Sequence, residues 1–265
     1  MKSIEKQILG LIDLAVTVQV KELVDIYEVR GYKEITLRNA LSQLKKINSI
    51  ETVSRGTYRI TEYGQKAAKS LNSKRQHVRE SFDNNWCVVI MQIPEKYRKQ
   101  KDAFKLIISN LGFAQYYSNI YISPWDYEKA ICTSLERLEL KEYANIIKGS
   151  FSMTPVTSEQ AYRLWNIPKL ENLYKQEEQW ITKNFSNIEK TIHDSDDLTL
   201  FNSYLDLDEH IENILLQDPF LPSPLLPKGW NGNRILKRLT NLHDLIGNKL
   251  RQNSQYNKFI KGGNG

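Results

Sequence analysis

The clearest hydrophobic pattern in the chain lies between Thr36 and Ile47, where the sequence reads TLRNALSQLKKI. Its apolar positions recur with the spacing of one helix face: Leu37, Ala40, Leu41, Leu44 and Ile47. The opposite face is polar and carries Arg38, Asn39, Ser42 and Lys46, flanked by Gln43 and Lys45. The pattern predicts an amphipathic helix that Thr36 caps through its hydroxyl oxygen.

Two helical patterns precede this segment, and a hairpin pattern follows it. The first begins after Ser3 and the second runs from Val18 to Tyr27, with inward positions at Ile4, Ile8, Leu11, Ile12, Val20, Leu23 and Ile26. Downstream, IETV, the turn SRGT with Gly56, and YRI predict two short strands. Three helices followed by a hairpin predict a winged helix-turn-helix domain over residues 1–64.

The polar helix face and the hairpin carry groups that suit DNA. Lysine and arginine bind phosphates, and amide and hydroxyl groups reach base edges. The candidate DNA contacts are Thr36, Arg38, Asn39, Ser42, Gln43, Lys46, Arg55 and Arg59. Two alternatives stay open: the helix is an ordinary amphipathic surface helix, or Arg59 only pairs with a nearby glutamate.

The middle of the chain alternates strand and helix patterns. Residues 65–85 are polar and basic and are predicted to be a linking helix that ends in a loop; after them, WCVVIMQI from Trp86 reads as a buried strand that Pro94 ends. Helices are predicted over 98–110 and 125–138, with strands in AQYYSNIYIS between them and in YANIIKGSF after them. The order β-α-β-β-α-β predicts a ferredoxin-like domain over residues 86–154.

Residues 155–265 are predicted to be a helical C-terminal domain that is a candidate for binding an effector. Helices are expected over 158–185, 198–216 and 231–250, the last with Ile235, Leu239, Leu242 and Leu245 on its apolar side. The proline-rich connection DPFLPSPLLPKGW separates the second from the third. The predicted fold class is therefore α+β, with three domains.

Charge is unevenly distributed along the 265 residues. Residues 1–80 carry 15 Lys and Arg against 9 Asp and Glu, a net charge of +6; residues 81–227 carry 14 against 21, a net −7. Residues 228–265 carry 8 against 1, a net +7. Basic ends suit contact with a polyanion, which the acidic middle would repel.

Composition limits the location and the chemistry. No apolar run approaches the roughly 18 residues of a membrane span, and the N-terminus lacks the pattern of a signal peptide, so we expect a cytoplasmic protein without membrane contact. Cys87 and Cys132 lack metal-ligand spacing and are expected to be packed thiols.

Catalytic motifs are absent from the sequence: it contains no GxSxG, GxGxxG, P-loop or HExxH. Four carboxylates near His210 form either a metal site or, as their helical pattern favours, a solvated face: Asp206, Asp208, Glu209 and Glu212. Four aromatic residues either line an effector pocket or pack in the core: Trp125, Trp165, Tyr174 and Trp180. We expect no enzymatic activity and no cofactor.

Three stretches together resemble the PaaX-type transcriptional repressors, named for control of phenylacetate catabolism. They are LRNALSQLKK with YRITEYG; WCVVIMQIPEKYRK with LGF and NIYISPWD; and LWNIPKLENLY with DPFLPSPLLPKGWNG. The resemblance spans nearly the whole chain, and the proline-rich stretch is its most distinctive part. It implies a homodimeric DNA-binding protein that a small effector releases from its operator, which for founding members is phenylacetyl-coenzyme A.

The resemblance also implies that the middle domain is similar to the small ferredoxin-like nuclease of CRISPR adaptation systems. Many relatives have Asp-Ile-Pro-Glu where this chain has Gln92-Ile93-Pro94-Glu95, and a neutral amide is a poor ligand for the divalent cation of phosphodiester hydrolysis. Asn48 stands where relatives often have glycine.

Three functions follow as hypotheses. The first is a ligand-responsive regulator whose dimer binds an inverted-repeat DNA operator and whose effector is acyl-coenzyme A-like. The second is a metal-dependent nuclease that uses the central domain. The third is a DNA-binding protein without an effector. The sequence favours the first.

Overall fold

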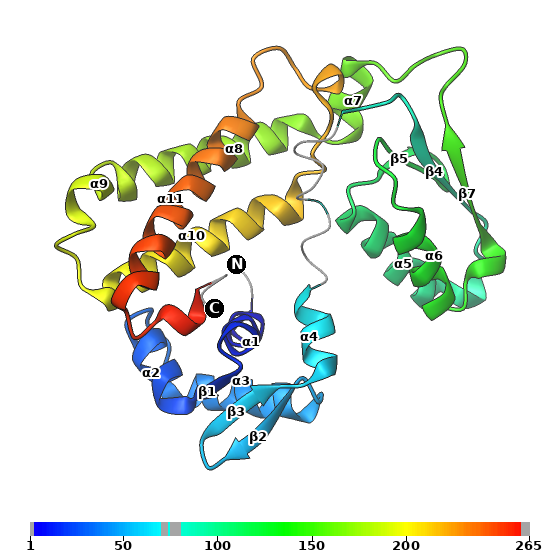
Figure 1. The fold of residues 1–265 in the computed structure, drawn as a ribbon. Coiled ribbons are helices and arrows are strands. Elements are labelled where there is room, and N and C mark those ends of the chain that lie inside the picture. Colours follow the sequence, from blue (N-terminus) through cyan, green and yellow to red (C-terminus); the bar gives the residue numbers. More distant parts are fainter. Residues whose placement is uncertain (1–2, 70–73, 75–80, 261–265) are drawn as a thin grey trace. The chain divides into compact units, whose positions relative to one another are not determined.

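The computed structural model describes residues 3–69, 74 and 81–260 (Figure 1). Helices alternate with two antiparallel sheets, as expected for the α+β class. The chain forms two compact units: unit 1 takes residues from 1–72, 179–213 and 236–265, and unit 2 from 73–178 and 214–235. These units cut across the predicted C-terminal region 155–265, whose helices contribute residues to both.

Unit 1 begins with four helices and a three-stranded sheet. Its elements are α1 (Ile4–Ala15), β1 (Thr17–Gln19), α2 (Val20–Glu28), α3 (Glu34–Lys46), β2 (Ile50–Ser54), β3 (Thr57–Ile60) and α4 (Glu62–Lys69). The strand order is β1-β3-β2, and both pairs are antiparallel. The second helix therefore starts at Val20 and not at Val18, because Val18 pairs with Tyr58 in the sheet.

The apolar faces of these helices form the core that the periodicity predicted. Ile8, Leu11 and Ile12 of α1 are buried, as are four residues of α3: Leu37, Ala40, Leu41 and Leu44. Two predictions about α3 are wrong. Thr36 is not the N-cap, since the helix begins two residues earlier with Lys33 as its cap. Ile47 lies beyond the last turn, and its side chain is exposed.

Segments from the end of the chain complete unit 1. They include α9 (Ile188–Thr191), most of α10 (Asp197–Gln217) and of α11 (Gly232–Asn253), and the 3-10 helix η5 (Asn257–Phe259). Phe201 of α10 stacks on Tyr256 with ring centroids 4.7 Å apart, and η5 packs against α1. On α11 the buried positions include Ile235, Leu239, Ile246 and Leu250. Leu245 is exposed, so its predicted place on the apolar side is wrong.

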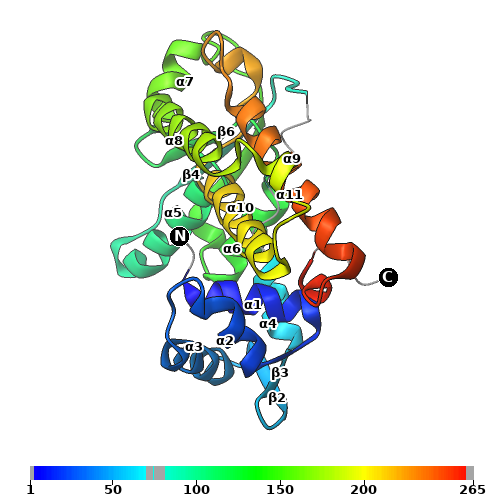
Figure 2. The same ribbon diagram turned by 90° about the vertical axis from the view of Figure 1, so that its left-hand side faces the viewer.

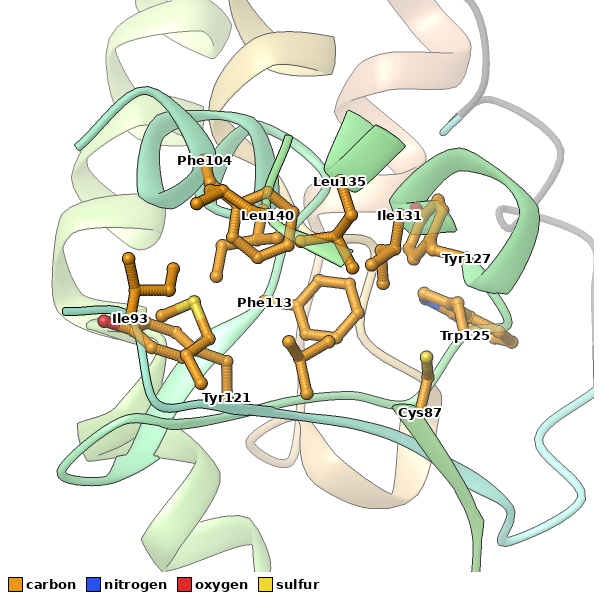
Figure 3. Packing of buried hydrophobic residues seen from close by; sticks show 13 residues of the cluster. Cys87, Ile93, Phe104, Phe113, Tyr121, Trp125, Tyr127, Ile131, Leu135 and Leu140 are labelled. Carbon is orange, nitrogen blue, oxygen red and sulfur yellow. The ribbon is translucent and has the colours of Figure 1, made fainter. Parts of the chain in front are cut away.

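Unit 2 contains the predicted β-α-β-β-α-β order. Its elements are β4 (Trp86–Met91), α5 (Arg98–Asn110), β5 (Ala114–Tyr117), β6 (Ile120–Ser123), α6 (Glu128–Arg137) and β7 (Ala144–Gly149), with 3-10 turns at Glu95–Tyr97 and Lys141–Tyr143. The antiparallel strand order is β5-β6-β4-β7. Side chains from α5 and α6, such as Phe104 and Leu135, pack on Tyr121 and Cys87 of the sheet (Figure 3). Cys87 is a packed thiol as expected, whereas Cys132 is exposed.

The helix predicted over 158–185 is two helices, α7 (Ser158–Leu164) and α8 (Ile167–Phe185). Asn166 adopts a left-handed conformation between them, with φ of 48°. Pro168 follows in the first turn of α8. A proline has no N–H to donate to the preceding turn of a helix continuing from α7, whereas in the first turn of a new helix that N–H is not needed, so the single helix is interrupted here.

The proline-rich connection is held by a buried polar cluster at Asp218. The Tyr174 hydroxyl donates to Asp218 Oδ2 at 2.5 Å, and the backbone N–H of Phe220 donates to Asp218 Oδ1 at 2.6 Å. Lys74 Nζ donates to the carbonyls of Leu216 and Asp218 at 3.0 and 3.1 Å. Phe220 has a φ of 54° and its carbonyl accepts from the Trp125 indole at 2.9 Å, so several bonds fix an unfavourable backbone conformation.

Because of the buried lysine of this cluster, the stability of the fold is expected to vary with pH in the alkaline range. Burial lowers the pKa of Lys74 from 10.5 to about 8, against the raising effect of the Asp218 carboxylate. Between those two pH values the unfolded chain binds more protons at this site than the folded chain. The free energy of unfolding of the wild type, relative to Lys74→Met, is expected to rise from pH 8 to 10.5 by up to about 1.4 kcal/mol per pH unit. Urea denaturation at several pH values measures this difference. If the free energy of unfolding changed equally with pH in both proteins, the prediction would be wrong.

Candidate nucleic-acid interface

The polar face of α3 is open to solvent. Arg38, Asn39, Ser42, Gln43 and Lys46 are all exposed, on the side opposite the buried leucines, which confirms their predicted orientation. Thr36 is half-buried. The β2–β3 hairpin lies beside the C-terminal end of α3, and its tip extends beyond the helices α1–α3 (Figures 1 and 2). A helix face and a projecting hairpin are therefore presented by the same unit.

A compact turn fixes the helix to the hairpin. Asn48 adopts a left-handed conformation with φ of 56°, a backbone conformation that favours glycine over other residues. The Thr61 hydroxyl donates to the Asn48 carbonyl at 2.6 Å and accepts from the Gly64 N–H at 3.1 Å. A Cβ on Gly64 would lie 2.1 Å from the Ser49 carbonyl oxygen, so only glycine fits there. At the hairpin tip, Gly56 has a φ of 75°.

Two of the predicted DNA-contacting arginines are bound by glutamates. Arg38 Nε and Nη2 lie 2.7 and 2.5 Å from Glu34 Oε1 on the same helix. Arg59 Nε and Nη2 lie 2.8 and 2.6 Å from Glu51 Oε1 on the neighbouring strand. All four side chains are about half exposed, from 48% to 57%. The alternative considered from the sequence, that Arg59 pairs with a nearby glutamate, therefore agrees with the Glu51–Arg59 contact.

The other cations of this surface differ. Arg55 at the hairpin tip and Lys46 near the end of α3 are exposed, and no salt bridge between described residues includes either of them. They remain available to phosphates. Among the predicted DNA contacts, two cations are therefore available and two are neutralised locally.

The first turn of α3 adds residues that the sequence prediction missed. Because the helix begins at Glu34, both Glu34 and Ile35 belong to the turn that precedes Arg38, and Ile35 is 61% exposed. N-terminal residues of a recognition helix contact base edges in helix-turn-helix proteins, and apolar side chains there contact thymine methyl groups. The four-residue spacing between Glu34 and Arg38, which allows an ion pair on one helix face, was the sequence signal that could have identified Glu34.

Arg30, just before the turn into α3, is held by α10. Its Nη1 lies 2.7 Å from Asp206 Oδ1 and donates to the Asn202 carbonyl at 3.3 Å, and its Nη2 lies 2.5 Å from Glu209 Oε1. The side chains of Arg30 and Glu209 are only 12% and 17% exposed. Burial raises the pKa of Glu209, and the neighbouring Arg30 opposes that shift. The acidic segment around His210 is therefore not simply a solvated face, because two of its carboxylates bind Arg30.

The four aromatic candidates for an effector site are used in packing. The Trp125 indole donates to Phe220, the Trp165 indole donates to the Gly112 carbonyl at 2.8 Å, and Tyr174 binds Asp218. These three belong to unit 2. Trp180 belongs to unit 1, where it stacks on His210 with ring centroids 3.6 Å apart. Packing, the alternative role weighed from the sequence, accounts for the contacts of each residue.

The central domain places Gln92 just after β4, with its side chain exposed and its N–H bonded to the Tyr143 carbonyl at 2.8 Å. Nearby, Glu95 pairs with Arg98 at 3.4 Å. Within the part of the chain that the structure describes, no group of three or more His, Cys, Asp and Glu side chains is arranged to hold a metal ion. No described helix combines the length and apolar character needed to cross a membrane.

Comparison with known proteins defines the class. A family model described as the PaaX protein central Cas2-like domain matches residues 79–161, and one described as the PaaX-like protein C-terminal domain matches residues 165–259. These are domains of transcription regulators. The chain belongs to the PaaX-type family.

A solved structure has the same overall fold. It is the uncharacterized protein Rv0674 from Mycobacterium tuberculosis, which is 16% identical with a TM-score of 0.54. The match covers 88% of this chain and 89% of that one. No curated protein matches the sequence.

Proposed function

We propose that the protein is a sequence-specific DNA-binding transcription regulator and that residues 1–64 form its winged helix-turn-helix domain. In this proposal α3 enters the major groove and the β2–β3 hairpin is the wing. The observation that carries it is the exposed stripe of Arg38, Asn39, Ser42 and Lys46 beside a projecting hairpin with Arg55 at its tip. Such a surface provides both phosphate contacts and groups that read base edges.

The remaining domains support regulation rather than catalysis. The β-α-β-β-α-β unit over 86–149 has the strand order of a ferredoxin-like domain, and Gln92 replaces the carboxylate that a metal-dependent nuclease needs. Family membership supports a homodimer on an inverted-repeat operator. It also supports repression that a small effector, acyl-coenzyme A-like in chemistry, relieves. A thermal-shift series with acyl-coenzyme A thioesters tests the effector, because a ligand of the folded state raises Tm.

Substitutions on α3 separate base reading from phosphate binding. Arg38→Ala is expected to reduce discrimination between operator and unrelated DNA by about 1–3 kcal/mol, because a bidentate contact to guanine is lost. Lys46→Ala is expected to weaken binding to all sequences alike and to flatten the salt dependence by about one phosphate contact. Fluorescence anisotropy with both DNAs measures each effect. Equal weakening on every sequence by Arg38→Ala would contradict base reading.

The proposal as a whole is tested by selecting genomic fragments with the purified protein and with its Arg38→Ala variant. An inverted-repeat motif enriched by the wild type and lost with the variant supports the regulator. Uniform retention of all fragments indicates a non-specific DNA binder. Absence of retention overturns the assignment of α3 as a recognition helix.

A further inference from the structure

The two glutamate–arginine pairs of the candidate interface share one geometry. In each pair a single carboxylate oxygen contacts both Nε and Nη2 of the arginine, at 2.7 and 2.5 Å in α3 and at 2.8 and 2.6 Å in the hairpin. One pair lies on each element expected to touch DNA. Both glutamates thus add negative charge to a surface that would face phosphates, which requires an explanation.

Stability of the fold does not provide that explanation. Exposed ion pairs contribute little to folding, since solvent screens them and the long side chains lose conformational freedom. The α3 helix is already anchored by its buried leucines, and β2 by the antiparallel ladder with β3. A role in DNA binding accounts better for paired charges at half-exposed positions.

We propose that Glu34 and Glu51 are specificity-determining residues of the DNA interface, which neutralise and orient Arg38 and Arg59. The proposal rests on the DNA-binding function proposed above. Each glutamate reduces the attraction of its arginine for phosphates, which all DNA sequences share. Sequence-independent binding is thereby weakened, and it is left to cations such as Lys46 and Arg55.

The geometry lets the same contact assist binding to the operator. A guanidinium has five N–H donors in a rigid fork, and Glu34 occupies only Nε and one side of Nη2. Within the described residues, Nη1 of Arg38 makes no hydrogen bond, so this end of the fork is available for the O6 and N7 atoms of a guanine. Holding the fork in place reduces the conformational freedom that Arg38 loses on binding. On unrelated DNA, where no guanine is positioned for this end of the fork, the neutralised guanidinium attracts phosphates less than a free one would.

The test compares Glu34→Gln and Glu51→Gln with the wild type in the full chain. Anisotropy titrations over a series of KCl concentrations use the selected operator fragment and an unrelated fragment of equal length. Near ~0.1 M salt each variant is expected to bind unrelated DNA about five- to tenfold more tightly, with a salt slope steeper by about 0.9, as for one added phosphate contact. Operator affinity is expected to change by about twofold at most, so the specificity ratio falls.

Glu28→Gln is the matched control. Glu28 is exposed on α2 of the same unit and takes part in no salt bridge between described residues, so its substitution changes net charge equally without releasing an arginine. An equal gain in unrelated-DNA binding by Glu28→Gln would overturn the proposal in favour of a general charge effect. So would an unchanged specificity ratio in both test variants.

A double variant shows whether Glu34 acts through Arg38. In the Arg38→Ala background, Glu34→Gln is expected to lose most of its effect on the specificity ratio and on the salt slope. A full effect in that background would contradict the proposal. These outcomes are distinct from failure of the proposed function, which would appear as a wild type that does not discriminate between the two fragments.

Discussion

Replacing Arg30 with methionine is expected to lower the free energy of unfolding by about 3 kcal/mol. The substitution leaves Glu209, whose side chain is only 17% exposed, without its cation, and it removes the contact from Asp206. Removing one member of a mostly buried ion pair is costly because the other charge stays desolvated. Urea denaturation followed by tryptophan fluorescence measures the change.

The exposed pair on α3 provides the comparison. Arg38→Met removes an arginine whose partner is half exposed, and we expect it to change stability by less than about 1 kcal/mol. The double variant Arg30→Met/Glu209→Met is expected to recover part of the loss, since no carboxylate then remains buried without a cation. Equal, small losses for Arg30→Met and Arg38→Met would show that the α10 contacts contribute no more than a surface ion pair.

Replacing Asp218 with alanine is expected to have a similarly large effect, about 3 kcal/mol. Asp218 accepts hydrogen bonds from the Tyr174 hydroxyl and the Phe220 N–H, and all three groups are buried. Two donors would be left without acceptors, each at a cost of about 1–3 kcal/mol. Burial raises the pKa of Asp218, so relief of carboxylate desolvation offsets part of this loss.

Asp218→Asn separates the hydrogen bonds from the charge. Its amide oxygen can still accept from one of the two donors. We therefore expect the free energy of unfolding of Asp218→Asn to lie between those of the wild type and Asp218→Ala. The same urea titration, with a Tyr174→Phe variant that removes only the hydroxyl, apportions the effect. If Asp218→Ala unfolds within about 1 kcal/mol of the wild type, the cluster does not fix the proline-rich connection.

The elements with strong local periodicity were predictable from the sequence. The helix over Arg98–Asn110 has the predicted bounds, because its apolar spacing and its flanking residues agree. The ends of other helices were not predictable in the same way. Lys33 caps α3 without a side-chain hydrogen bond, and Asn166 interrupts a continuous helical pattern through its left-handed backbone.

The candidate site was predictable only where one helix face defines it. Exposure of Arg38 and Asn39 follows from the burial of Leu37 and Leu41, because a helix places these residues on opposite faces. The partners of Arg30 lie about 175 residues away in the sequence, where periodicity carries no information. The Glu51–Arg59 pair depends on the register of the hairpin around Gly56, which places the two residues directly opposite each other.

Unit 1 is built from stretches far apart in the chain, which determines when a newly made protein can complete it. Arg30 needs Asp206 and Glu209, and α1 packs against η5, whose Phe259 is buried. At about 5–20 residues per second, a ribosome adds Glu209 roughly 10–35 s after Arg30. Until then the nascent region of α1–α3 and the hairpin has an incomplete core. A chain released before α10 would therefore lack the partners of Arg30 in the turn before α3, although every residue of α3 had been made.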